Sequence, residues 1–286
     1  MIPLINRKTA RGMLFAGCSF TWGQGLYYYS SLPTLREPPP DCYIHEYVTE
    51  AHKRYMATIR YPRLVADHFN TWEVVHPYNG GSNFSAIEWW RSSFNAMDYT
   101  KPCRTHKQFE YSEFSHVFLQ LTQAHRNNFI VEIDGEHYDI PLNIALGDGS
   151  GHDPWPARFK RWLDMQNLTY DQWYDRYVQN NINQVKSFLQ EFENHGVIAT
   201  LFTWPDNEYN EKINNDPWLK SRLMTFNYKD HEYYSIEGLM RHNKELEIKH
   251  DYSNFIETPK DHHPSRQCHR VIADHIIARL AQQGFV

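Results

Sequence analysis

The sequence predicts an α/β fold in which helices cover both faces of a doubly wound, mostly parallel sheet, giving three α/β/α layers. Four short runs of apolar or β-branched residues are each followed by polar or glycine-rich residues, as is typical of buried parallel strands. Segments with helical spacing of apolar residues alternate with these runs, which is the pattern of βαβ units. The predicted strands are Met13–Cys18, Trp72–His76, His116–Leu121 and Val197–Trp204.

The predicted helices lie between and after these strands. Tyr61–Phe69 should form a helix before the second strand, and Ser85–Asn95 should form one after it. Ala273–Gln282 carries apolar residues at helical spacing and closes the chain.

A hairpin is predicted after the third strand. Phe129–Ile133 and His137–Pro141 flank the pair Asp134–Gly135, and an Asp-Gly pair between two such runs is a strong turn signal. A minimal fold of this class does not need this hairpin, so we interpret it as part of an insertion.

A long helical region follows the hairpin, from about Pro156 to Asn194. The polar stretch Asn167–Thr169 should break this region and start a second helix. We interpret Phe129–Tyr170 as an insertion over the carboxyl edge of the sheet, where it would shape a substrate pocket.

Length and composition fit one domain spanning residues 1–286. Apolar residues make up 41% of the 286 residues, which is enough for a single core, and no Gly/Ser-rich linker interrupts the chain. Aromatic residues reach 15%. We interpret most of these rings as packing residues, with a sugar-stacking or assembly surface as the alternative. A net charge of −5 without a Lys/Arg run argues against a nucleic-acid partner.

Cysteine usage and hydropathy predict the compartment. Cys18, Cys42, Cys103 and Cys268 are far apart and form no C-x-x-C pair, which suits reduced thiols better than a disulfide framework. No apolar run approaches the roughly 20 residues that span a bilayer. The apolar run at Met13 is too short for a signal peptide. We therefore expect a chain that is cytoplasmic when made and has no membrane partner.

Two segments at opposite ends of the chain carry residues for nucleophilic chemistry. Gly17–Thr21, with the sequence Gly-Cys-Ser-Phe-Thr, places a small serine directly after the first predicted strand, where a glycine lets the backbone turn sharply. Asp261–Ser265, with the sequence Asp-His-His-Pro-Ser, supplies a carboxylate and imidazoles just before the final helix. A serine hydroxyl needs a base to take its proton, and the imidazole base needs a carboxylate to hold its tautomer.

These segments resemble the SGNH (GDSL-like) family of serine esterases, which has a Gly-x-Ser-x-Thr motif near the amino terminus and a D-x-H-P or D-x-x-H-P motif near the carboxyl terminus. The resemblance implies that Ser19 is the nucleophile, Asp261 the orienting acid and His263, directly before the proline, the base. His262 is the alternative base, and Cys18 stands where the family commonly has Asp. The resemblance also implies a flavodoxin-like α/β/α fold and a reaction that needs no metal or organic cofactor.

The family's second block predicts part of an oxyanion hole. The second strand is followed by Tyr-Asn-Gly-Gly-Ser-Asn, and the resemblance implies that the N–H of Gly80, with Gly81 as the alternative, points into the hole together with the N–H of Ser19. The structural alternative is a plain strand-to-helix turn capped by Ser82 or Asn83.

The third block departs from the family pattern. The family commonly ends its third strand in Gly-x-Asn-Asp, in which the Asn side chain completes the oxyanion hole. Here Thr122 stands at the Asn position and Gln123 offers an amide one residue later. A hydroxyl donates only one hydrogen bond, so the departure bears on whether the site is catalytic.

Patterns for metal or phosphate binding are incomplete. His45, Glu46 and His52 do not form H-E-x-x-H, and Gly147–Gly151 is not followed by the Lys-Ser/Thr of a P-loop. The histidines before Pro264 and the pair Cys268–His269 have poor spacing for zinc.

Two functions follow from these observations. The first is a serine esterase that hydrolyses a carboxylic ester of a small molecule or glycan through an acyl-enzyme on Ser19, with an O-acetyl group on a carbohydrate as the candidate substrate. The second is a non-catalytic binding or structural component of a larger assembly that keeps the fold. The set Ser19, Asp261 and His263 favours the enzyme, whereas the altered third block favours the second function. The lack of an apolar lid segment makes a lipase the least favoured enzyme.

Overall fold

A parallel sheet forms the centre of the molecule. The computed structural model describes residues 11–18, 21, 50–75, 82–94, 109–126, 128–142, 145–146, 154–206, 208–243, 246 and 264–285. The four strands of the sheet lie in the order β2-β1-β3-β6 and pair in parallel. Their bounds are β1 (Gly12–Ala16), β2 (Glu73–Val75), β3 (Phe114–Leu121) and β6 (Ile198–Thr203). This order matches the first four positions of the flavodoxin-like arrangement, so the predicted doubly wound parallel sheet is confirmed.

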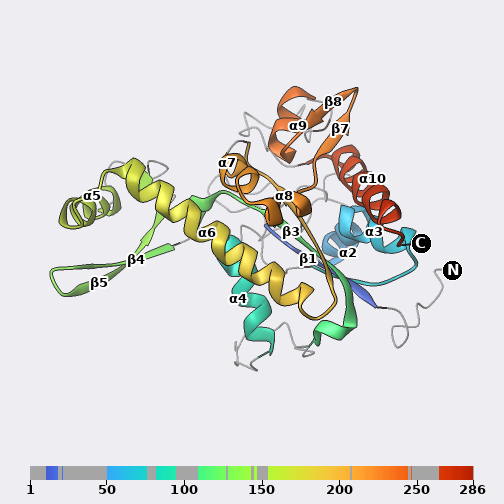
Figure 1. The fold of residues 1–286 in the computed structure, drawn as a ribbon, viewed down its shortest axis with the longest axis horizontal. Helices are drawn as coiled ribbons and strands as arrows, with labels where there is room; N and C mark the ends of the chain where they lie inside the picture. The colour runs from blue at the N-terminus through green and yellow to red at the C-terminus, as the bar shows by residue number, and fades with distance from the viewer. Residues whose placement is uncertain are drawn as a thin grey trace.

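Helices cover both faces of this sheet, which confirms the predicted three layers (Figure 1). Leu14, Val117 and Leu119 pack on one face, and their neighbours Met13 and Phe118 pack on the other, because alternate side chains of a strand point to opposite faces. The first face is covered by α4 (Asn83–Phe94) and α6 (Tyr170–Glu193). The second face is covered by α3 (Tyr61–His68), α9 (Ile236–His242) and α10 (Arg266–Gln282).

The final helix begins earlier than predicted. α10 starts at Arg266 rather than Ala273, because Ser265 caps it by accepting a hydrogen bond from the Cys268 N–H at 3.2 Å. The first turn of α10 then buries Cys268 and His269 in the core. The remaining helical elements are α2 (Glu50–Ile59), α7 (Asn210–Asn214), α8 (Pro217–Arg222) and the short 3₁₀ turns η3 (Tyr111–Glu113) and η4 (Ala124–Arg126).

The predicted hairpin and the break in the long helical region are both confirmed. β4 (Asn128–Ile133) and β5 (Glu136–Pro141) pair antiparallel, and both turn residues, Asp134 and Gly135, have positive φ. α5 (Trp155–Met165) ends before Asn167, which has a φ of 55°. Thr169 then caps α6 by accepting a hydrogen bond from the Gln172 N–H.

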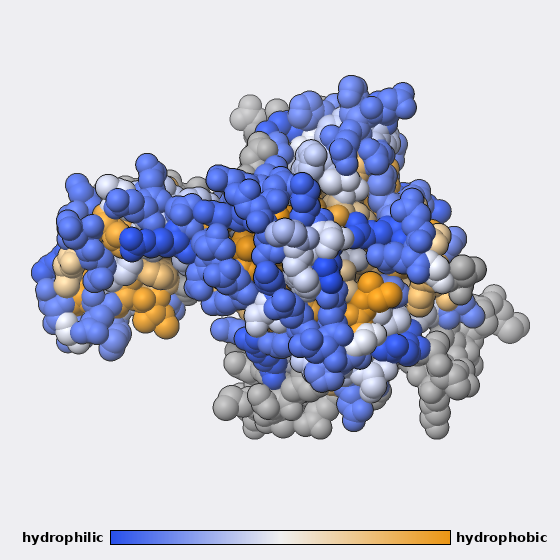
Figure 2. Space-filling view, in the orientation of Figure 1, coloured by the Kyte–Doolittle hydropathy of each residue, from blue (hydrophilic) through white to orange (hydrophobic). Residues whose placement is uncertain are grey.

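The place of this insertion differs from the prediction. The described part of Phe129–Tyr170 starts beside the carboxyl end of β3, but the hairpin and α5 project away from the sheet as an arm instead of covering its edge (Figure 1). Phe129 packs against Trp162 of α5 and Trp173 of α6, so the first half of α6 supports the arm. Apolar side chains show on the surface of the arm, where Ile130 is 72% exposed (Figure 2).

Beyond β6, two isolated parallel bridges extend the sheet within the described residues, from Leu201 to Leu223 and from Thr203 to Ser235. The chain between these bridges forms an antiparallel hairpin of β7 (Phe226–Tyr228) and β8 (His231–Tyr233). α9 follows this hairpin and packs against it.

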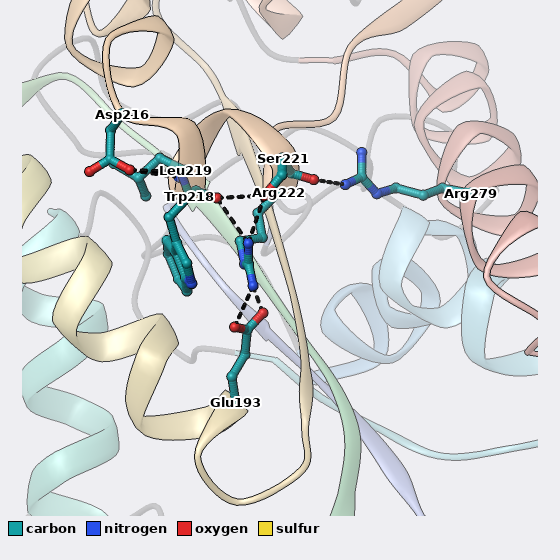
Figure 3. Close-up of polar contacts among 7 residues, drawn as sticks. All are labelled: Glu193, Asp216, Trp218, Leu219, Ser221, Arg222 and Arg279. Carbon is teal, nitrogen blue, oxygen red and sulfur yellow. Dashed lines mark hydrogen bonds and ion pairs between the residues drawn. The ribbon is translucent and has the colours of Figure 1, made fainter.

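Polar contacts fix α8 where the chain enters the β7–β8 hairpin (Figure 3). The Arg222 guanidinium stacks on Trp218, with its central carbon 4.0 Å from the ring centroid, and donates two hydrogen bonds to the Glu193 carboxylate at the end of α6. From α10, Arg279 donates to the Ser221 and Leu223 carbonyls at 3.0 and 2.8 Å. A bidentate Arg–carboxylate pair and capped carbonyls hold α8 between two long helices.

Two further sequence expectations concern cysteines and membranes. Of the four cysteines, Cys18 and Cys268 lie within the described residues, and both are buried free thiols. In the part of the chain that the structure describes, no helix combines the length and apolar character needed to cross a bilayer.

Candidate active site

The carboxyl ends of β1 and β3 are adjacent at the centre of the sheet, with β2 beyond one and β6 beyond the other. The strand order reverses here, and doubly wound folds bind ligands in the crevice at such a switch point. Gly17 and Cys18 follow β1, and Thr122 follows β3. Gly17 and Cys18, from the motif that contains Ser19, and Thr122, from the third block, therefore lie at the place where an α/β fold positions ligand-binding groups.

The turn after β1 requires a glycine at position 17. A Cβ on Gly17 would lie 2.1 Å from the Thr21 hydroxyl oxygen and 3.0 Å from the Gln120 Cβ. The Thr21 side chain therefore folds back over Gly17, so these two described residues of the motif are in contact. This packing explains why the motif has glycine and threonine at its two ends.

A buried hydrogen-bond network holds this turn. The Thr21 hydroxyl donates to the Gln120 Oε1 at 2.5 Å and accepts from the Tyr61 hydroxyl at 2.9 Å. The Gln120 amide lies 3.7 Å from the Cys18 sulfur, towards which it donates. Burial raises the pKa of the Tyr61 hydroxyl, so it remains a donor. The network ties the turn to β3 and to the start of α3.

The same network reaches the first turn of α10. The Tyr61 N–H donates to the His269 Nδ1 at 3.1 Å, and the two rings stack with centroids 5.6 Å apart. The accepting Nδ1 places the proton of the neutral imidazole on Nε2. Burial raises the pKa of the neighbouring Cys268 thiol, which keeps it protonated and unreactive. His269 and Cys268 are therefore core residues that position α10.

The segment before α10 is anchored close to this network. Pro264 and Ser265 are buried, and the Ser265 N–H donates to the Leu246 carbonyl at 2.7 Å. Thr21 lies two residues after Ser19, and Pro264 lies directly after His263. Tyr61 therefore connects Thr21, in the first motif, to His269, whose N–H donates to the Ser265 carbonyl.

Thr122 lies at the carboxyl end of β3 and is 1% exposed. Its N–H donates to the Asn83 Oδ1 at 2.8 Å, and its carbonyl accepts from the Asn83 Nδ2 at 3.2 Å and from the Tyr209 hydroxyl at 2.6 Å. Within the described residues its own hydroxyl has no hydrogen-bond partner. Both backbone groups of Thr122 are thus occupied, whereas its buried hydroxyl has no partner among the described residues.

Glu208 braces the turn that follows Thr122. Its two carboxylate oxygens accept from the Ala124 N–H at 3.1 and 3.2 Å, and the Tyr174 hydroxyl also donates to it. Burial raises the pKa of the Glu208 carboxyl, an effect that these hydrogen bonds oppose in part. The turn after β3 is therefore fixed from α6 and from the chain after β6.

Several predicted site residues lie outside the described residues, and the structure describes the flanks around them. These are Ser19, Gly80, Gly81, Asp261, His262 and His263. Ser82 is described and caps α4 by accepting from the Ser85 N–H at 3.0 Å, as the structural alternative expected. Gln123, the alternative to Thr122, accepts a hydrogen bond from Arg126 at 3.3 Å. Among the described residues, no group of three or more His, Cys, Asp or Glu side chains is arranged to hold a metal ion.

Sequence reasoning missed Asn83, Tyr209 and Glu208 as residues that shape the site. The sequence indicates Asn83 only as a helix cap. In the structure its amide oxygen accepts a hydrogen bond from the Thr122 N–H at the end of β3, and its amide nitrogen donates to the Tyr209 hydroxyl at 2.9 Å. No local pattern marks these contacts, because each joins residues at least 39 positions apart.

Comparison with known proteins gives structural likenesses only. Neither a protein-family model nor a curated protein sequence matches this chain. A solved protein assigned to the lipolytic G-D-S-L family, from Desulfitobacterium hafniense, is 8% identical with a TM-score of 0.38, over 94% of this chain and 99% of that one. The acetyl xylan esterase Est2A from Butyrivibrio proteoclasticus is 11% identical with a TM-score of 0.43, over 96% of this chain and 64% of that one.

A family two carbohydrate esterase from Clostridium thermocellum, solved as an active-site mutant, is also 11% identical, with a TM-score of 0.40. That alignment covers 96% of this chain and 65% of the esterase chain, so this chain spans just under two thirds of both esterase chains. Identities and TM-scores at this level carry no argument about activity.

Proposed function

We propose that this protein is a serine hydrolase of the SGNH type that cleaves carboxylic esters. The observation that carries the proposal is the turn after β1. Thr21 folds over Gly17 at the switch point, so two described residues of the motif that contains Ser19 are in contact at the carboxyl edge of the sheet. A nucleophile needs rigid support of this kind from its neighbours.

In the proposed reaction the Ser19 hydroxyl oxygen attacks the ester carbonyl carbon while His263 takes its proton. The tetrahedral intermediate collapses, the alcohol leaves with the proton from His263, and an acyl-enzyme remains on Ser19. Water, deprotonated by His263, then attacks the acyl group and releases the acid and the free serine. Asp261 holds the imidazole in the tautomer that this exchange needs.

The proposed oxyanion hole combines the N–H groups of Ser19 and Gly80 with the hydroxyl of Thr122. The buried Thr122 hydroxyl supports this role, because its backbone groups are held by Asn83 and Tyr209 while the hydroxyl is unpaired among the described residues. A donor fixed before the reaction stabilises developing charge without reorganising. The candidate substrate is an O-acetyl group on a carbohydrate.

Hydrolysis of p-nitrophenyl acetate by the full-length protein tests this proposal. Ser19→Ala should abolish turnover, and His263→Ala should lower it by several orders of magnitude, because the serine loses its base. His262→Ala is the matched control and should retain most of the activity. A wild-type protein that is folded but inactive would refute the proposal. A severe loss of activity in His262→Ala, but not in His263→Ala, would identify His262 as the base.

One observation favours a second function, a binding or structural component without catalysis. The third strand ends in Thr122, which offers a single donor where the family pattern has an Asn amide with two. Under this alternative the Ser19→Ala protein would be indistinguishable from wild type in every assay of ester hydrolysis.

A further inference from the structure

A pocket lies between α9 and the β7–β8 hairpin. Its volume is about 700 Å³, within the range of small-molecule sites. Asp206 lies on its wall three residues after the end of β6, and Asn243 lies on its wall directly after α9. The surface over these elements is predominantly hydrophilic (Figure 2).

Backbone hydrogen bonds connect the pocket to the segment that contains His263, the predicted base. The Leu246 N–H donates to the Asn243 carbonyl at 2.9 Å, and the Leu246 carbonyl accepts from the Ser265 N–H at 2.7 Å. Ser265 follows His263 by two residues. One short run of hydrogen bonds therefore links the wall of the pocket to the segment that carries the proposed base.

The walls of the pocket offer aromatic faces and neutral hydrogen-bonding groups. Tyr233 and His242 have ring centroids 5.8 Å apart, and Tyr234 is 44% exposed. The His242 Nδ1 donates to the Gly238 carbonyl at 2.8 Å, because a carbonyl only accepts. In the neutral imidazole this leaves Nε2 as an acceptor. No aliphatic side chain and no Phe or Met is among the described lining residues.

The pocket contains charged groups of both signs. The Asp206 carboxylate accepts from the Ser235 hydroxyl at 3.2 Å and pairs with Arg241 at 3.1 Å. Lys229 and Glu232 contribute one charge of each sign. Among the described lining residues, a fatty acyl chain would meet tyrosine rings but no aliphatic side chain, and a strongly charged ligand would meet groups of both signs.

We infer that this pocket binds a neutral carbohydrate and serves as the subsite for the alcohol portion of the ester. Tyrosine rings present flat apolar faces to the C–H faces of a sugar, while the phenol, imidazole and amide groups exchange hydrogen bonds with its hydroxyls. The role as an ester subsite rests on the proposed function, whereas the binding of the carbohydrate does not.

Binding of cellohexaose and xylohexaose to the full-length Ser19→Ala protein, measured by calorimetry, tests the inference. This protein cannot form the proposed acyl-enzyme, so binding is seen apart from catalysis. We expect saturable binding of at least one of the two oligosaccharides and none of octanoate or oligogalacturonate. Tyr234→Ala, added to Ser19→Ala, should weaken binding about tenfold, because a stacked ring supplies a large share of the contact.

Tyr170→Ala is the matched control, since Tyr170 is 42% exposed but lies at the start of α6, in the arm. Equal affinities of the two tyrosine variants, no binding of either oligosaccharide, or binding of octanoate would overturn the inference. Tyr234-dependent binding together with an inactive wild-type protein would support the carbohydrate pocket and remove the esterase.

Discussion

Gly17→Ala should destabilise the protein strongly, because the space for a methyl group is already filled. The new Cβ would lie 2.1 Å from the Thr21 hydroxyl oxygen, a distance that no pair of non-bonded atoms tolerates. Thr21 would have to turn away from Gly17. It would then give up its hydrogen bonds with the Gln120 Oε1 and the Tyr61 hydroxyl.

The expected cost follows from these losses. Overpacking a tight site costs about 1–3 kcal/mol, and each lost hydrogen bond costs about 1 kcal/mol net. The free energy of unfolding should therefore fall by roughly 3–5 kcal/mol, a large part of the roughly 5–15 kcal/mol of a typical protein. For a protein of this size the melting temperature should drop by about 10 °C.

Thermal and urea unfolding of Gly17→Ala, Thr21→Ala and the double variant measure this effect. Thr21→Ala removes the oxygen that obstructs the new methyl group, so the hydrogen bonds are lost only once in the double variant. The double variant should therefore be more stable than the sum of the two single effects by about 1 kcal/mol or more. Simple additivity, or a Gly17→Ala protein within 1 kcal/mol of wild type, would refute the packing described for this turn.

Three further predictions concern the end of β3. Thr122→Val should lower kcat/KM by the factor that corresponds to a loss of roughly 2–4 kcal/mol of transition-state stabilisation. It should not lower the melting temperature, because the Thr122 hydroxyl is buried and unpaired among the described residues. Asn83→Ala should lower kcat more than it raises KM and cost about 2–3 kcal/mol in urea unfolding, since it frees the Thr122 N–H and leaves the Thr122 carbonyl with Tyr209 as its one described donor. Burial raises the pKa of Glu208, so the folded state binds the carboxyl proton more tightly than the unfolded state does. The protonated carboxyl therefore stabilises the fold at low pH, and this stabilisation is lost as pH rises through the folded-state pKa. Glu208→Gln should therefore melt higher than wild type at pH 8 and close to it at pH 4, and an unchanged difference across that range would exclude the shift.

The central strands were predictable from sequence because their chemistry is uniform. β1 and β3 are buried at every position and rich in apolar residues, as is typical of parallel strands covered on both faces. Ser115, His116 and Gln120 are the polar residues of β3, and Gln120 accepts a hydrogen bond from Thr21, which follows β1. The hairpin of the arm was predictable for a different reason, since Asp134–Gly135 supplies the positive φ angles that its turn needs.

The β7–β8 hairpin was not predicted, although its geometry is similar. Its turn residues Lys229 and Asp230 both have positive φ, at 49° and 64°, and neither is glycine. The backbone preference that marks such a turn is therefore absent from the sequence. Packing against α9 holds this conformation, and packing of that kind cannot be read from the residues themselves.

The site could be predicted only in part, because local motifs do not specify long-range contacts. The sequence placed Thr122 at the end of β3, and the structure agrees. The locking of its backbone by Asn83 and Tyr209 depends on how three distant segments pack. The arm was misplaced for the same reason, since the sequence of the hairpin fixes its turn but not the direction in which it leaves the sheet.

The central claim is that Ser19 is a nucleophile, and covalent labelling tests it most directly. The folded, full-length protein is treated with a fluorophosphonate, digested, and mapped by mass spectrometry. We predict one adduct, on the peptide that contains Ser19, and no adduct in Ser19→Ala or in heat-unfolded wild-type protein. No adduct on the folded protein, or an adduct on a different residue, would contradict the account.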